Sequence, residues 1–129
     1  MGIFAEHSGS FLRVAAVLTA VSFSIPISLF PLAWARALRW TIDDRSDLAL
    51  YFGRCLGVVA VVLSWGAWHA AGHAELQPFY FSVLIGIAVL LTLVHVVGAV
   101  QKVQPWTETA EIPFWGGLAL LGVLFYPAA

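Results

Sequence analysis

A chain of 129 residues that is 61% hydrophobic and 10% charged has too few charges to cover a water-facing surface, because an ordinary soluble domain carries about 25% charged residues. The net charge of -1 offers no basic face for nucleic acid, so we expect no nucleic-acid partner. The composition therefore indicates an integral membrane protein.

Four apolar segments follow one another, and little of the sequence lies outside them. A bilayer core about 30 Å thick needs about 20 mostly apolar residues per helix, so the first three segments are long enough to span it and the fourth is short. We predict an all-α fold, an integral membrane four-helix bundle forming a single transmembrane domain over residues 1–129. The predicted helices cover residues 11–34, 48–71, 79–100 and 112–126.

The first segment contains a proline well inside its apolar run. Pro26 predicts a kink or a break near residues 22–24, because a proline removes a backbone hydrogen bond from the helix interior. Ser22, Ser24 and Ser28 can bond to backbone carbonyls in such a segment.

A short amphipathic stretch follows Pro31. Trp34 and Leu38 are four residues apart and share one helical face, while Arg36 and Arg39 share another. This pattern predicts a short helix lying in the headgroup layer. A plain continuation of the first helix beyond the membrane is the alternative that the sequence leaves open.

The two polar loops, residues 41–47 and 101–111, predict the orientation. With four spans, both loops lie on one side of the membrane and both termini lie on the other. The basic residues on the loop side are Arg36, Arg39, Arg45 and Lys102, with Arg54 just inside the second helix. Only Arg13 falls on the other side. Since basic residues stay cytoplasmic, we predict a cell inner (plasma) membrane protein with both termini outside the cytoplasm.

Small residues recur at helical spacing and predict close helix packing. Gly53 and Gly57 form a GxxxG spacing in the second helix, and Ser82 and Gly86 form a similar pair in the third. The fourth helix carries Gly116, Gly117 and Gly122. We expect contacts among the second, third and fourth helices, or between copies of the chain, with packing inside one chain favoured.

Ionisable residues at membrane depth are costly and suggest function. Arg54 lies about two turns into the second helix and His95 about two turns before the end of the third, so both are at similar depth. We predict a polar cluster of Arg54, His95 and Glu111 or Glu108, which either binds a lipid headgroup, a carboxylate or a partner protein, or clamps the fold. Rival carboxylates are Asp44 and Asp47.

A second group of candidate ligands contains His69 and His73, whose spacing of four would place them on one face of a helix, together with Glu75. Three such side chains can hold a metal ion, although interfacial histidines without a metal fit the same pattern. These histidines lie about 20 Å along the helix axis from His95, so we expect no bis-histidine haem within one chain. A haem held by a single histidine or between subunits stays open, and no resident cofactor is predicted. No catalytic grouping is visible in the sequence, and we expect no enzymatic activity.

The hairpin from Pro31 through the helix opening at residues 47–57 resembles small four-helix membrane proteins of the DoxX-like type. It also resembles the ergosterol-biosynthesis scaffold protein of the endoplasmic reticulum. Arg54, Gly57 and His95 occupy the matching positions. The resemblance implies a non-enzymatic membrane adaptor that tethers lipid-metabolising enzymes.

These observations predict a small multi-pass membrane protein that acts as a scaffold or accessory subunit of a membrane complex. Its expected partners are membrane lipid and other membrane proteins or a second copy of itself. The alternative is a protein that binds or transports a lipid or small hydrophobic molecule, and a third possibility is an electron-transfer or metal-binding membrane subunit.

Overall fold

The computed structural model describes residues 2–43 and 46–127, and the regular structure within them is helical throughout. The prediction of an all-α fold is therefore confirmed. Contacts divide the chain into two compact units, Met1–Phe11 with Ala70–Ala129 and Leu12–His69, and each is described here by itself. Asp44 and Arg45, which entered the sequence analysis, lie outside the described residues.

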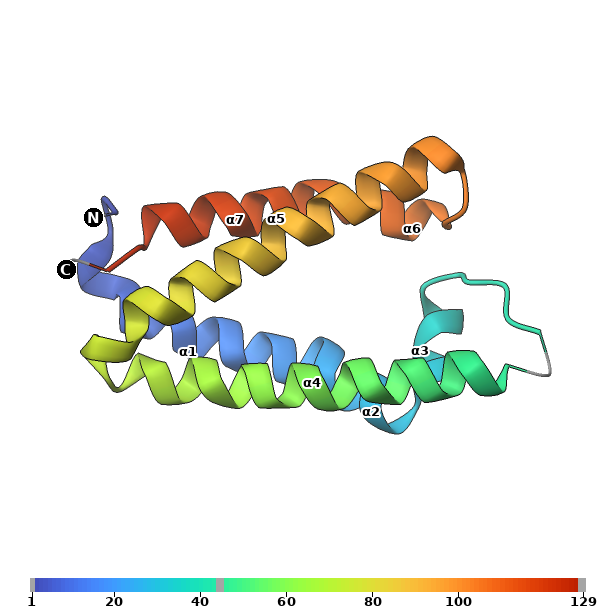
Figure 1. Cartoon of the computed structure of the whole chain (residues 1–129), viewed down its shortest axis with the longest axis horizontal. Coiled ribbons are helices and arrows are strands. Elements are labelled where there is room, and N and C mark those ends of the chain that lie inside the picture. The colour runs from blue at the N-terminus through green and yellow to red at the C-terminus, as the bar shows by residue number, and fades with distance from the viewer. Residues whose placement is uncertain (1, 44–45, 128–129) are drawn as a thin grey trace. The chain divides into compact units, whose positions relative to one another are not determined.

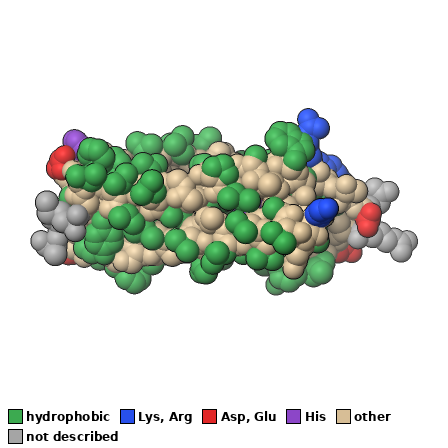
Figure 2. Space-filling view, turned by 90° about the horizontal axis from the view of Figure 1, so that it is seen from above, with side chains coloured by type: hydrophobic (Ala, Val, Ile, Leu, Met, Phe, Trp, Pro, Cys, Tyr) green, Lys and Arg blue, Asp and Glu red, His purple; other side chains and the backbone are tan. Residues whose placement is uncertain are grey.

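Three stretches of helix are long and apolar enough to cross a membrane, namely Ala5–Leu29, Asp47–Ala71 and Ala74–Gln101. In the most apolar 18 residues of each stretch, at most 22% are buried inside the protein. Hydrophobic side chains and backbone make up most of the surface seen in Figure 2, where charged side chains are few. The chain thus exposes the kind of surface that lipid covers.

In the unit Leu12–His69, the first long helix changes its hydrogen-bonding pattern where the sequence predicted a kink. The α-helix α1 (Ser8–Thr19) passes into a π-helical turn, η2 (Ala20–Ser24), and then into α2 (Ile25–Leu29). Pro26 occupies the first turn of α2, so its missing N–H is accommodated where the ladder is already altered.

Three serine hydroxyls bond to backbone carbonyls around this turn, as predicted. Ser22 Oγ donates to Leu18 O at 2.6 Å, and Ser28 Oγ donates to Ser24 O at 2.7 Å. Ser24 Oγ lies 3.2 Å from Thr19 O. Side-chain hydroxyls thereby bond to backbone carbonyls in a helix that is apolar enough to cross a membrane.

The segment after Pro31 is a separate short helix. Phe30 has non-helical backbone angles (φ -133°, ψ 55°), and α3 begins directly after it and covers Pro31–Ala37. Trp34 Nε1 donates to Ser22 O at 3.2 Å, which holds α3 against the π-helical turn. The break at Phe30 favours the predicted short helix over a continuation of the first helix.

The helix α4 (Asp47–Ala71) carries the GxxxG pair. A Cβ atom built on Gly53 would lie 2.5 Å from Pro31 Cβ, and one built on Gly57 would lie 2.6 Å from Ser28 Cα. Both glycines therefore allow close packing inside the chain, as favoured by the sequence. Their partners, however, are residues of the first apolar segment and not of the third or fourth helix.

In the other unit, α5 (Gln77–Gln101) and α7 (Ile112–Leu124) lie side by side and antiparallel, and α6 (Trp106–Thr109) forms part of their connection (Figure 1). Short 3₁₀ turns at Ala5–His7 and Ala74–Leu76 precede α1 and α5. A Cβ atom on Gly122 would lie 2.7 Å from Ile85 Cγ1, so this glycine brings α7 close to α5.

The two ends of the described chain meet in this unit. The N–H groups of Gly2 and Phe4 donate to the carbonyl oxygens of Tyr126 and Leu124 at 2.9 and 3.0 Å. The Tyr126 hydroxyl donates to Pro78 O at 3.1 Å. The chain start, the beginning of α5 and the end of α7 are therefore joined at one end of this unit.

Candidate functional site

His95 is the centre of a polar cluster at the other end of the α5–α7 hairpin. It lies on α5 about 9 Å before the helix ends at Gln101, at 1.5 Å per residue, and its side chain is 9% exposed. Its Nδ1 atom lies 2.7 Å from the carbonyl oxygen of Leu91, one turn earlier. Because a carbonyl oxygen only accepts hydrogen bonds, Nδ1 carries the proton and Nε2 is directed away from the helix backbone.

Two carboxylates face Nε2 from the connection between α5 and α7. Glu108 Oε2, on α6, lies 3.1 Å from Nε2, and Glu111 Oε2, just before α7, lies 3.6 Å from it. The side chains are 13% and 30% exposed, respectively. The local backbone explains this convergence, because α6 and the turn after it place two acidic residues, three apart, on the same side.

Two further side chains fix the cluster. Trp115 Nε1 donates to Glu111 Oε2 at 3.0 Å, from the first turn of α7. Gln104 Nε2 donates both to His95 O at 3.0 Å and to Thr109 Oγ1 at 3.1 Å. The loop between the helices is therefore tied to α5 by side-chain amide and imidazole groups as well as by the chain itself.

The structure brings together three of the four residues predicted for the inner cluster, namely His95, Glu108 and Glu111. Arg54 belongs to the unit Leu12–His69, and its place beside them stays a prediction. The sequence analysis missed Trp115 and Gln104. The spacing of four between Glu111 and Trp115 on a helix offered a signal for the former, whereas nothing in the sequence marked Gln104.

The predicted metal ligands His69, His73 and Glu75 are arranged differently from expectation. The predicted shared helical face does not form, because α4 ends at Ala71 and His73 has extended backbone angles (φ -132°, ψ 95°). The His69 ring stacks on Trp65, with ring centroids 5.5 Å apart. Within residues 2–43 and 46–127, the set of three His and acidic residues with ligand atoms within 4.8 Å of one another is His95, Glu108 and Glu111.

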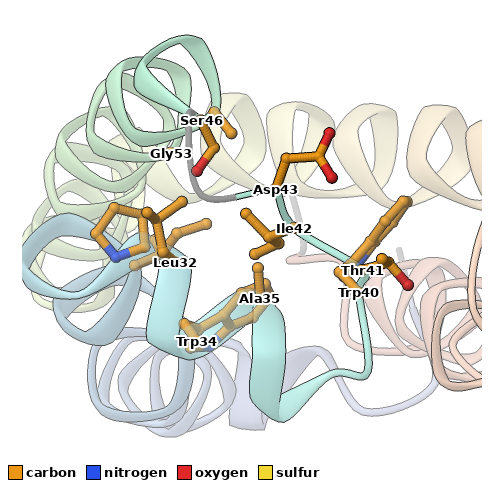
Figure 3. Close-up of a pocket in the computed structure, with 12 residues that line it drawn as sticks. Leu32, Trp34, Ala35, Trp40, Thr41, Ile42, Asp43, Ser46 and Gly53 are labelled. Atoms are coloured by element: carbon orange, nitrogen blue, oxygen red, sulfur yellow. The ribbon is translucent and has the colours of Figure 1, made fainter.

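A separate cavity of about 330 Å³ lies within the unit Leu12–His69 (Figure 3). Its wall is formed by α3, by the polar segment that follows and by the first turns of α4. Apolar side chains, among them Leu32, Trp34 and Ile42, line most of it, and Asp43 and Ser46 supply polar groups. An apolar pocket with a few polar groups at one side is typical of a site for an amphiphilic molecule.

No family model, curated protein or solved structure matches the chain. The resemblance to DoxX-like proteins and to the ergosterol-biosynthesis scaffold protein therefore stays a prediction. Any functional assignment rests on the geometry described above.

Proposed function

We propose that the chain is a small, non-enzymatic, multi-pass membrane protein that serves as a scaffold or accessory subunit of a membrane complex. One observation carries the proposal. The loop 101–111 is fixed by hydrogen bonds to α5, and it exposes apolar side chains on its surface. His95 and Gln104 fix the loop, and Val103 and Trp106 are 63% and 65% exposed. A preformed loop loses little conformational entropy when a partner docks on it.

Four membrane crossings are supported by the hydrogen bond between Gly2 and Tyr126. Chain ends that are joined lie on the same side of a membrane, so the chain crosses it an even number of times. Three long helices give three crossings, and α7 supplies the fourth. The helix α7 (Ile112–Leu124) extends about 20 Å at 1.5 Å per residue, which is shorter than the core thickness of about 30 Å, so this crossing requires the bilayer to thin locally around it.

The charges support an orientation with both termini outside the cytoplasm. In a four-span arrangement, Arg36, Arg39 and Lys102 lie on the side opposite to the termini, and Arg13 lies on the side of the termini. Because Lys and Arg are retained on the cytoplasmic side, the loop 101–111 faces the cytoplasm. A cytoplasmic (inner) membrane is the location that this bias favours.

Site-specific crosslinking tests the docking proposal. A photoreactive amino acid at Val103 is expected to crosslink to a discrete partner in membranes, and Trp106→Ala is expected to remove that crosslink. Phe79→Ala is the matched control, since Phe79 is 73% exposed but lies at the start of α5. A protein that crosslinks to nothing, or that elutes alone from mild detergent at every yield, contradicts the proposal.

A second candidate function, binding of a lipid or small hydrophobic molecule, is favoured by the cavity beside α3. Native mass spectrometry is expected to detect a retained amphiphile, and Ala49→Phe, which fills the cavity, is expected to release it. Leu48→Phe is the control, because Leu48 is exposed and does not line the cavity. Retention of the molecule in both variants contradicts binding at this place.

A further inference from the structure

We infer that His95, Glu108 and Glu111 form a binding site for a divalent first-row transition-metal cation. The inference is independent of the docking proposal. It starts from the ring of His95, whose Nδ1 proton is fixed by Leu91 O at 2.7 Å. In the neutral ring, Nε2 then presents a lone pair, and it presents it to two carboxylate oxygens.

Without a proton or a cation between them, these atoms would face one another as acceptors in a poorly solvated site. The His95 side chain is 9% exposed and that of Glu108 is 13% exposed, so water screens their charges weakly. One proton shared by the three groups leaves a net negative charge, whereas a divalent cation neutralises both carboxylates. A cation bound among the three groups therefore satisfies all of them at once.

The distances suit such a cation. Metal–ligand bonds of about 2.1 Å place neighbouring ligand atoms about 3.0–3.4 Å apart at octahedral or tetrahedral angles. Glu108 and Glu111 oxygens lie 3.1 and 3.6 Å from Nε2, and the three ligand atoms lie within 4.8 Å of one another. Small side-chain adjustments are enough to bring all three onto one ion.

The groups around the three ligands are those that support metal-binding residues elsewhere. A histidine ligand usually donates its other ring N–H to a carbonyl or carboxylate, as His95 does to Leu91, and ligating carboxylates are themselves hydrogen-bonded, as Glu111 is by Trp115. One imidazole and two carboxylates suit Zn²⁺, Mn²⁺ or Fe²⁺. Three protein ligands leave at least one coordination position for water or for another molecule.

Zinc and manganese binding to the purified full chain, carrying no histidine tag, tests the inference. After removal of metals with a chelator and reloading, we expect about one Zn²⁺ per chain by elemental analysis. Glu111→Gln is expected to weaken binding by at least about tenfold, and Trp115→Phe by about tenfold. Because Glu111 is 30% exposed, Glu111→Gln is expected to keep the fold, which the elution volume in detergent verifies. Glu75→Gln is the matched control and is expected to bind like the unaltered chain.

The nitrogen ligand is tested separately by pulsed electron paramagnetic resonance of the Mn²⁺-loaded chain. A coupling to an imidazole nitrogen is expected to disappear in His95→Gln and to persist in His73→Gln. No zinc binding by the unaltered chain overturns the inference in favour of a shared proton. Equal binding by the unaltered chain and Glu111→Gln, or loss of the nitrogen coupling only in His73→Gln, overturns it in favour of another site.

Discussion

The backbone N–H of Gly2 lies 2.9 Å from the carbonyl oxygen of Tyr126 and donates a hydrogen bond to it. This bond joins the segment before the first long helix to the end of α7. Ser8 Oγ strengthens the junction by donating to Phe125 O at 2.7 Å. Because a bilayer cannot pass between two bonded backbone groups, this contact gives the topology a direct experimental consequence.

We predict that loop residues 74–76 and 110 lie on opposite sides of the membrane. In a Cys55→Ala background, a membrane-impermeant maleimide applied to intact cells is expected to label Glu75→Cys and not Ala110→Cys. Both variants are expected to react once the membrane is permeabilised, which serves as the control. Labelling of Ala110→Cys but not of Glu75→Cys in intact cells contradicts the orientation, and labelling of both there contradicts the crossing by α5.

A buried serine pair in the unit Leu12–His69 is expected to couple energetically. Ser24 Oγ and Ser64 Oγ lie 3.1 Å apart, and both residues are buried. A double-mutant cycle of Ser24→Ala and Ser64→Ala is expected to give a coupling of about 0.6 kcal/mol in the free energy of unfolding, the average for hydrogen bonds between membrane helices. A cycle of Ser22→Ala with Ser64→Ala is the control and is expected to give none. Zero coupling in the first cycle contradicts the bond.

Local features of the first apolar segment were predictable because each follows from one residue and its near neighbours. Pro26 predicted the altered hydrogen bonding, which the π-helical turn Ala20–Ser24 confirms. Pro113 lies in the first turn of α7, a position in which its missing N–H costs no helical hydrogen bond. These effects act through the backbone within one turn, so a sequence carries them directly.

Contacts between distant residues were predictable only where few partners exist. Few carboxylates lie near the end of the third predicted helix, where His95 is placed. The antiparallel order of the third and fourth helices brings Glu108 and Glu111 to that end, so they could be predicted as its partners. Gly57 had many apolar neighbours to choose from, and its contact with Ser28 could not be read from its spacing. Small-residue packing depends on shape, and several of the apolar segments carry glycine, alanine or serine at similar spacing.

Substitution by alanine is expected to change stability in opposite directions at two glycines, Gly57 and Gly86, that share a small-residue spacing of four. A Cβ atom on Gly57 would lie 2.6 Å from Ser28 Cα, so Gly57→Ala is expected to destabilise the chain by about 1–3 kcal/mol through overpacking. Gly86 has no such neighbour within 4 Å, and Gly86→Ala is expected to be neutral or stabilising by up to about 1 kcal/mol. Denaturation in detergent measures both. Equal effects at the two positions contradict the proposed packing role of Gly57.

The last prediction concerns the amide of Gln104, which holds the loop 101–111 against α5. Gln104→Ala removes the hydrogen bonds to His95 O and Thr109 Oγ1, and we expect a loss of about 1 kcal/mol in the free energy of unfolding. Because the loop is also held by Glu108, we expect it to open locally before the helices separate. Hydrogen exchange is therefore expected to accelerate in residues 103–110 and to stay unchanged in α7.

Gln101→Ala is the matched control for this variant, since Gln101 is an exposed glutamine at the end of α5, three residues before Gln104. It is expected to leave both stability and exchange of the loop unchanged. If Gln104→Ala also leaves the exchange of the loop unchanged, the two hydrogen bonds do not hold it. The surface that presents Val103 and Trp106 would then depend on the contacts of His95 with Glu108 and Glu111, and His95→Gln would be expected to release the loop instead.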